Sequence, residues 1–307
     1  MKFRDRFRAM KEEATSRLDK AVANVPLPDI EGASLALELA QRAKSNLESC
    51  RCDYNERRYA DAAEGMQQAV EKTSKAFGLL TGTAKPSQEE MREVGHKSFK
   101  AFLLHFGEYY PKMIALMQAQ AEIPDSPIFD SPGMRGVGKA LKTIFQKQLD
   151  ELPPVDKVEA EILELKALKP EIMWKPTLML DQSNKWVASS VADLKKRPLY
   201  SAGQKAVIGA GKGAVSHLGI FKKETLERTN LAGELGEAGQ RLFSLAILTC
   251  WHLEPARYPS VGDYWNLSAY NESAPLIQAL PQLLGHTEAA VGHTIGASGL
   301  ALKIIRV

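Results

Sequence analysis

The stretch YADAAEGMQQAVEKTSKAFGLL, from Tyr59 to Leu80, has the residue pattern of one amphipathic helix. Its core-facing residues recur at alternating intervals of four and three, which is the period of an α-helix. Gly82 follows the last turn, at a position where glycine commonly caps a helix. The predicted core-facing stripe comprises Tyr59, Ala63, Met66, Val70, Thr73, Phe77 and Leu80.

The same period appears in the residues that precede this stretch. Residues 1–23 form a basic amphipathic helix, which Pro26 and Pro28 end because proline cannot continue a helix. This helix suits docking on the same protein or a partner, and also contact with RNA or a membrane surface. A second helix is expected to begin near Ser34, a residue type that caps helix N-termini. Its predicted buried stripe contains Leu35, Leu39, Ala43 and Leu47.

The helical pattern returns near the end of the chain. It begins again at Leu231, and a strongly apolar helix is expected to end before Pro255. A last helix is expected from Ser273 or Ala274, since Pro275 suits a first-turn position. Four leucines of this helix should face the core: Leu276, Leu280, Leu283 and Leu284. The best candidate for a strand, EIMWKPTLML, is interrupted by Pro176, so the sequence predicts an all-α fold.

Proline and glycine divide the chain. Three prolines and two glycines between Ala121 and Gly136 mark a linker or a long loop. Beyond it, residues 185–228 hold nine Lys or Arg against three acidic residues, so this stretch is a candidate electrostatic surface, although a solvated charged face has the same composition. We therefore expect four regions. These are an N-terminal helix and linker (1–31), a first helical half (32–120), a basic and mostly helical insertion (121–230) and a second helical half (231–307).

Composition limits the classes of function. The net charge is +3, from 40 basic and 37 acidic residues, so any surface for nucleic acid must be local. Three cysteines in 307 residues argue against a disulfide framework, and Cys50 and Cys52 are expected to be small core thiols. No apolar run is long enough to span a membrane, and we expect a cytoplasmic protein. The six histidines form no metal motif, so neither a metal ion nor a cofactor is expected.

Two glycine-rich stretches only partly match phosphate-binding motifs. GMRGVGKAL places Ala140 where a P-loop needs Ser or Thr for the magnesium ion, and no strand precedes it. VIGAGKGAVSHLG has Ala214 where the dinucleotide fingerprint needs glycine. A glycine-rich turn could still contact phosphate through backbone N–H groups, with Lys205 and Lys212 close in sequence.

Arg92 and His96 are the candidate catalytic pair. They are four residues apart in MREVGHKSF, which places them on one face of a predicted helix. A histidine can move the proton in RNA cleavage while a guanidinium stabilises the charged transition state. A surface pair without any function has the same spacing.

The helix from Tyr59 to Leu80 also carries two polar pairs that core packing does not require, Gln67–Gln68 and Glu71–Lys72. With its flanks, RRYADAAEGMQQAVEKTSKAFGLLTG resembles the HEPN family of small helical domains found in prokaryotic toxins and defence proteins. GHKSFKAFL, from Gly95 to Leu103, is similar to a short family segment. ARYP, from Ala256 to Pro259, and the helix after it resemble the end of the domain.

This resemblance implies a four-helix antiparallel bundle that is split by the insertion and forms a homodimer. It implies binding of RNA or a nucleotide in a prokaryotic defence or toxin–antitoxin setting, and metal-independent endoribonuclease activity by Arg92 and His96. The residues implied in RNA or nucleotide binding are Glu71, Lys72, Lys97, Arg257, Lys205 and Lys212.

Alternatives remain open at this point. Family nucleases have four to six residues between the arginine and the histidine, whereas Arg92 and His96 have three between them. This spacing favours a non-catalytic member, which would bind RNA, a nucleotide or a protein partner such as an antitoxin or a defence component. A non-enzymatic interaction or scaffold protein is the second hypothesis. It is also open whether residues 34–110 form the domain alone, with the rest as a separate helical module.

Overall fold

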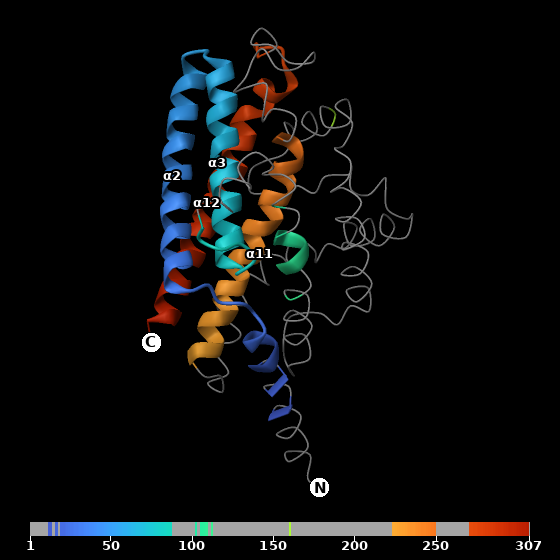
Figure 1. Ribbon diagram of the computed structural model, residues 1–307. Coiled ribbons are helices and arrows are strands. Elements are labelled where there is room, and N and C mark those ends of the chain that lie inside the picture. The colour runs from blue at the N-terminus through green and yellow to red at the C-terminus, as the bar shows by residue number, and fades with distance from the viewer. Residues whose placement is uncertain are drawn as a thin grey trace.

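Four long helices make up most of the described part of the computed structural model (Figure 1). The structure describes residues 12–13, 16–17, 19–87, 102, 105–109, 112, 160, 223–249 and 270–306. No strand occurs among these residues, and the all-α prediction is confirmed. The four helices are α2 (Ile30–Asn55), α3 (Tyr59–Leu80), α11 (Lys223–Thr249) and α12 (Pro275–Ile305).

Helix α2 begins earlier than the sequence prediction placed it. The carboxylate of Asp29 accepts a hydrogen bond of 2.6 Å from the backbone N–H of Gly32 and so caps the helix. Ser34 lies inside the helix, where its hydroxyl donates to the carbonyl oxygen of Ile30. The prediction of Ser34 as the N-cap was wrong because aspartate caps equally well and no residue between the two positions breaks a helix.

The buried face of α2 also differs from the predicted stripe. Leu35 and Leu39 are only partly buried and lie at the rim of the core. The centre of the face is made of small residues, which let α2 approach α3 closely; a Cβ atom on Gly65 of α3 would lie 3.2 Å from Cβ of Cys50. The buried residues of α2 are Gly32, Ala33, Ala36, Ala40, Ala43, Leu47 and Cys50.

Helix α3 has the predicted bounds, Tyr59 to Leu80. A turn at residues 56–58 joins it to α2, and Arg57 adopts a φ of 62° there. Gly82 adopts a φ of 65° after the last turn, which confirms its predicted capping position. More of α3 is buried than the single predicted stripe, because α2, α11 and α12 all pack against it.

Helices α11 and α12 form a second antiparallel pair. α11 begins at Lys223 rather than at Leu231. α12 begins at Pro275, and its four predicted leucines are buried, as expected. Two side-chain contacts join the helices in antiparallel register: an ion pair of Glu227 with Lys303 at 2.9 Å, and a hydrogen bond between Glu234 and His293 at 2.7 Å.

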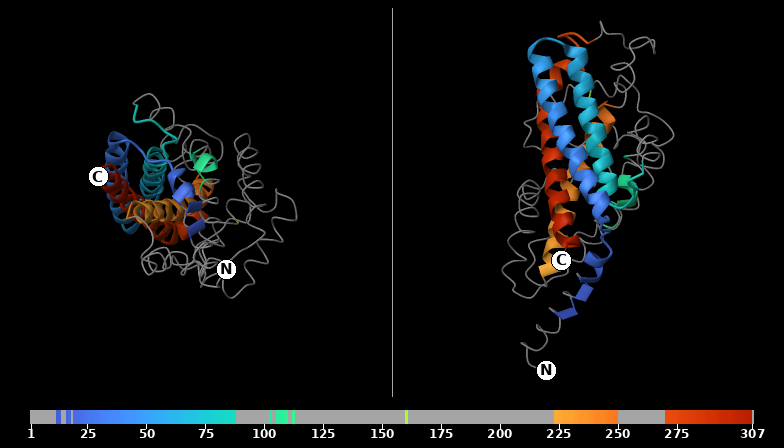
Figure 2. Two further views of the ribbon diagram at one scale, coloured as in Figure 1. Left: turned by 90° about the horizontal axis from the view of Figure 1, so that it is seen from below. Right: turned by 60° about the vertical axis from the view of Figure 1, so that its left-hand side comes forward.

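The two helix pairs share one apolar core. Figure 2 shows α2, α3, α11 and α12 side by side, with α12 lying against both α2 and α3. At the C-terminal end of α3, the ring of Phe77 contacts three aromatic rings of the segment 102–109 and lies against Gly239 of α11. The buried cluster therefore joins residues from both ends of the chain.

Several predictions lie outside the described residues. Of the basic region 121–230, the structure describes Ala160 and residues 223–230, and of the first helix it describes residue 12 onward in part. Within the described residues, no helix is long and apolar enough to cross a membrane.

Two glycines of α11 give a matched test of this packing. A Cβ atom on Gly239 would lie 2.8 Å from the ring of Phe106 and 2.9 Å from that of Phe77, whereas Gly233 is exposed and its Cβ would meet nothing within 4 Å. Gly239→Ala should therefore lower the free energy of unfolding by about 1–3 kcal/mol. Gly233→Ala should raise it by up to about 1 kcal/mol, since alanine favours a helix. Urea unfolding followed by circular dichroism measures both, and equal effects would contradict the packing.

Candidate functional site

Two of the predicted site residues, Glu71 and Lys72, lie in the described part of the chain. Glu71 pairs with Lys75 one turn later at 2.8 Å, and the two side chains are only 10% and 14% exposed. This is a largely buried ion pair within α3. The other predicted site residues lie outside the described residues: Arg92, His96, Lys97, Lys205, Lys212 and Arg257.

Lys72 belongs to a polar network between α2 and α3. Its Nζ lies 3.2 Å from Oε1 of Gln68, and the amide of Gln68 donates to Glu64 at 2.8 Å. The side-chain amide of Asn46 on α2 lies 2.9 Å from the same Gln68 oxygen. With its oxygen and nitrogen exchanged, Asn46 accepts from Lys72 at 3.0 Å. Asn46 therefore joins α2 to α3 in either orientation, through Gln68 in the first and through Lys72 in the second.

Gln67 of α3 is a buried polar residue whose side-chain oxygen has no hydrogen-bond partner among the described residues. Its side chain is 3% exposed. Burial of an amide oxygen without a donor is unfavourable. Gln67 shares a side of α3 with Glu71 and Lys75, because the three residues are four apart.

The last turn of α3 holds both flanks of the segment that carries Arg92 and His96. A Cβ atom on Gly78 would lie 3.1 Å from Cβ of Ala84 and 2.9 Å from the ring of His105, so both residues approach the helix closely. Ala84 precedes the segment 88–101, and His105 follows it. Ala84 and His105 therefore both lie near the C-terminal end of α3.

Charge is distributed unevenly along the sequence. The whole chain has a net charge of +3, and residues 185–228, which include Lys205 and Lys212, hold nine Lys or Arg against three acidic residues.

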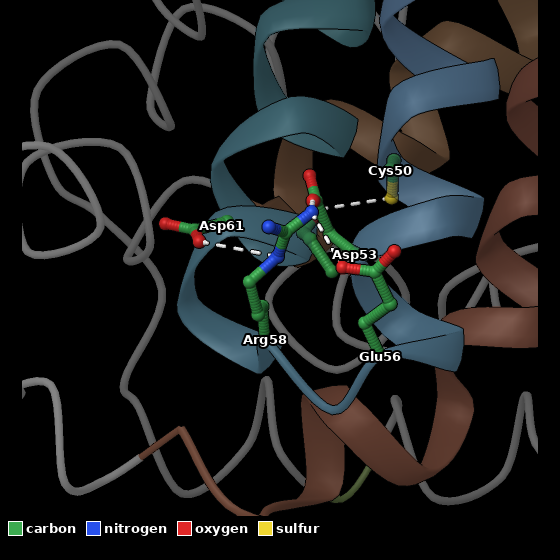
Figure 3. Close-up of polar contacts among 6 residues, drawn as sticks. Cys50, Asp53, Glu56, Arg58 and Asp61 are labelled. Atoms are coloured by element: carbon green, nitrogen blue, oxygen red, sulfur yellow. Dashed lines mark hydrogen bonds and ion pairs between the residues drawn. The ribbon is translucent and has the colours of Figure 1, made fainter.

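Arg58, which belongs to the resemblance, stabilises the turn between α2 and α3. Figure 3 shows its guanidinium among three carboxylates: it binds Asp53, lies 3.0 Å from Glu56 and lies 3.9 Å from Asp61. The hydrogen bond to Asp53, followed by the charge of Glu56, raises the pKa of Arg58. The neighbouring Tyr59 donates to Glu272 at 3.1 Å, which joins this turn to the start of α12.

The cysteines of α2 occupy two different environments. Cys50 is buried and its thiol donates to the carbonyl oxygen of Ala62, whereas Cys52 is exposed (Figure 3 shows Cys50). Burial raises the pKa of the Cys50 thiol to about 12. The prediction of two core thiols was therefore right for Cys50 and wrong for Cys52. Side chains two residues apart in a helix point in nearly opposite directions, so both cannot face the same core.

Histidines give no metal site among the described residues, where no group of three or more suitable ligand side chains occurs. His286 and His293 share a face of α12, as their spacing of seven predicts. His293 binds Glu234 of α11 through Nδ1. Sequence spacing could place the two histidines on one face. It could not identify Glu234 as the partner of His293, because Glu234 lies on another helix.

No protein-family model, no curated protein and no solved structure matches this chain.

Thiol chemistry tests the contrast between Cys50 and Cys52. In a Cys250→Ser background, a maleimide should label Cys52 rapidly at pH 8, while Cys50 reacts only after unfolding because its thiol stays protonated and buried. Above pH 9 the unfolded chain loses the thiol proton that the folded chain retains, so stability should decline from pH 9 towards 12. Cys50→Ala should remove that part of the decline. Rapid native labelling of Cys50 would contradict its burial.

Proposed function

We propose that this chain is a HEPN-like helical protein that binds RNA or a nucleotide as a homodimer, in a prokaryotic defence or toxin–antitoxin setting. One observation carries the proposal. The helix that bears the resemblance, α3, holds both flanks of the segment with Arg92 and His96 against its last turn, at Gly78. Ala84 and His105, which flank the segment 88–101 in sequence, therefore lie near the helix that carries Glu71 and Lys75.

The chemistry of the proposal is metal-independent cleavage of RNA. His96 would take the proton of the 2′-hydroxyl as its oxygen attacks the adjacent phosphorus and forms a 2′,3′-cyclic phosphate. The bond from phosphorus to the 5′-oxygen of the next nucleotide breaks, and that oxygen takes up a proton from water. Arg92 would stabilise the negative charge of the transition state. Lys97, Lys205, Lys212 and Arg257 would contact phosphates, and two of them, Lys205 and Lys212, lie in the basic stretch 185–228. Glu71 would act through Lys75, to which it is bound, rather than by touching the RNA.

The alternative is a non-enzymatic interaction protein that docks a protein partner, such as an antitoxin or a defence component. A specific observation favours it. The polar residues of α3 that identify the resemblance have partners inside the fold, since Glu71 pairs with Lys75 and Lys72 with Gln68. Three residues between Arg92 and His96 also fit a non-catalytic member better.

An RNA assay separates the two functions. The purified protein should cleave single-stranded RNA in the presence of EDTA, and His96→Ala should reduce the rate by about 10²-fold or more while RNA binding persists. Lys205→Ala with Lys212→Ala should weaken binding and lower the salt dependence of log K by about 1.4, near 0.7 for each phosphate that is no longer neutralised. Fluorescence anisotropy at several salt concentrations measures the binding.

Lys44→Ala, at an exposed position of α2, is the matched control and should change neither activity nor binding. Equal cleavage by the wild-type protein and His96→Ala would exclude the catalytic assignment. An absence of RNA and nucleotide binding at low salt would favour the protein-docking function.

A further inference from the structure

The outer face of α12 contains glycines at regular intervals. Gly285, Gly292 and Gly299 are seven residues apart, so they lie on one side of the helix. Gly292 and Gly299 are exposed, and a Cβ atom on either would meet nothing within 4 Å. Glycine in the middle of a helix is unfavourable compared with alanine.

Packing among the described residues does not require Gly292 or Gly299. At Gly78 and Gly239 the need for glycine is clear, because a Cβ atom would lie within 3 Å of an aromatic or histidine ring. Gly292 and Gly299 lower the stability of their helix, and no such contact occurs at either position in the part of the chain that the structure describes. Because glycine has no side chain, another backbone can approach the helix closely at these two positions.

The rest of this face is apolar along its length and charged at its ends. Ile295 and Leu302 are partly exposed beside the glycines. Between Glu288 and Lys303 the helix has no Asp, Glu, Lys or Arg. The charges that bound the face are opposite, and both are accessible: Glu288 is 38% exposed and Lys303 is 58% exposed.

The positions of Glu288 and Lys303 make the face complementary to a second, antiparallel copy of α12. If two copies of α12 cross antiparallel about a two-fold axis between Ile295 and Gly296, Gly292 of one copy lies opposite Gly299 of the partner subunit. The same axis places Glu288 opposite Lys303 of the partner subunit, at both ends of the contact. A parallel pairing would instead place like charges together, which is unfavourable.

The existing ion pairs of the protein fit this arrangement. Arg51 of α2 binds Glu288 at 2.5 Å, and Glu227 of α11 binds Lys303 at 2.9 Å. Across the two-fold axis the order becomes arginine, glutamate, lysine, glutamate, so the charges alternate in sign. Networks of this kind contribute more than isolated surface pairs.

We propose that a second copy of this chain docks on the outer face of α12, defined as Gly292, Ile295, Gly299 and Leu302 with Glu288 and Lys303 at its ends. The contact is isologous, because the same residues contribute from both subunits. The C-terminal end of α12 lies at the edge of the group of helices in Figure 2. The inference specifies the surface of the homodimer in the proposed function and is independent of its RNA chemistry.

Glycine variants test the surface. Gly292→Gln with Gly299→Gln should weaken the dimer of the full chain at least tenfold, because the new side chains keep the two helices apart. The monomer should remain folded, since both positions face open space. Gly233→Gln, at an exposed glycine of α11 outside the surface defined above, is the matched control and should leave dimerisation unchanged. Sedimentation velocity measures the association, and circular dichroism measures the fold.

Charge reversal tests the pairing itself. Glu288→Lys and Lys303→Glu should each weaken the homodimer at least tenfold, because each places like charges together at both ends. An equimolar mixture of these two variants should form a heterodimer, in which both ends regain opposite charges. The variants also lose the intramolecular ion pairs of Glu288 with Arg51 or of Lys303 with Glu227. Mixing the two variants does not restore these pairs, so recovery of association must come from the contact between subunits.

Three outcomes would overturn the inference. A wild-type chain that stays monomeric at 100 µM has no such interface, whatever the result of the RNA assay. A dimer that is unaffected by the glycine variants uses another surface, which would leave the proposed function standing. A mixture of charge variants that stays monomeric would exclude the antiparallel register.

Discussion

The contact of Phe77 with Gly239 is the constraint on which the arrangement of the helices depends. Phe77 lies in the last turns of α3, and its ring occupies the space that a side chain at Gly239 would fill. The rings of Phe102, Phe106 and Tyr109 surround it, and Phe106 stacks on Phe243 of α11. Aromatic rings bury a large apolar area, so this one cluster connects the two helix pairs from opposite ends of the sequence.

The sequence predicted the elements whose signals are local. The bounds of α3, the cap at Gly82 and the start of α12 at Pro275 depend on residues within a turn or two of each boundary. The capping and the buried face of α2 were predicted less well. Alanine and leucine both fit a helical stripe, and only the close approach of Gly65 to Cys50 determines that the alanines face inward.

The candidate site was predictable to a smaller extent. Periodicity could mark Glu71 and Lys72 as polar residues beyond the needs of the core. A spacing of four suggests that Glu71 can pair with Lys75 and Gln68 with Lys72. It could not show that the Glu71–Lys75 pair is largely buried or that Asn46 of α2 lies beside Gln68 and Lys72, because these depend on tertiary packing. The same reason explains why His293 was identified without Glu234. For Gly292 and Gly299 of α12, the spacing is visible in the sequence. It can be interpreted as a surface only when the fold shows that this side of the helix is exposed.

The central claim is that both ends of the chain build one core. Native-state hydrogen exchange over a series of low denaturant concentrations tests it most directly, since it gives the opening free energy of each region. Amides in the central turns of the four helices, near Ala40, Met66, Leu235 and Leu283, should converge on a single opening free energy that equals the global value. Helices α11 and α12 that open at a much lower free energy than α2 and α3 would show two separate modules and would contradict the account.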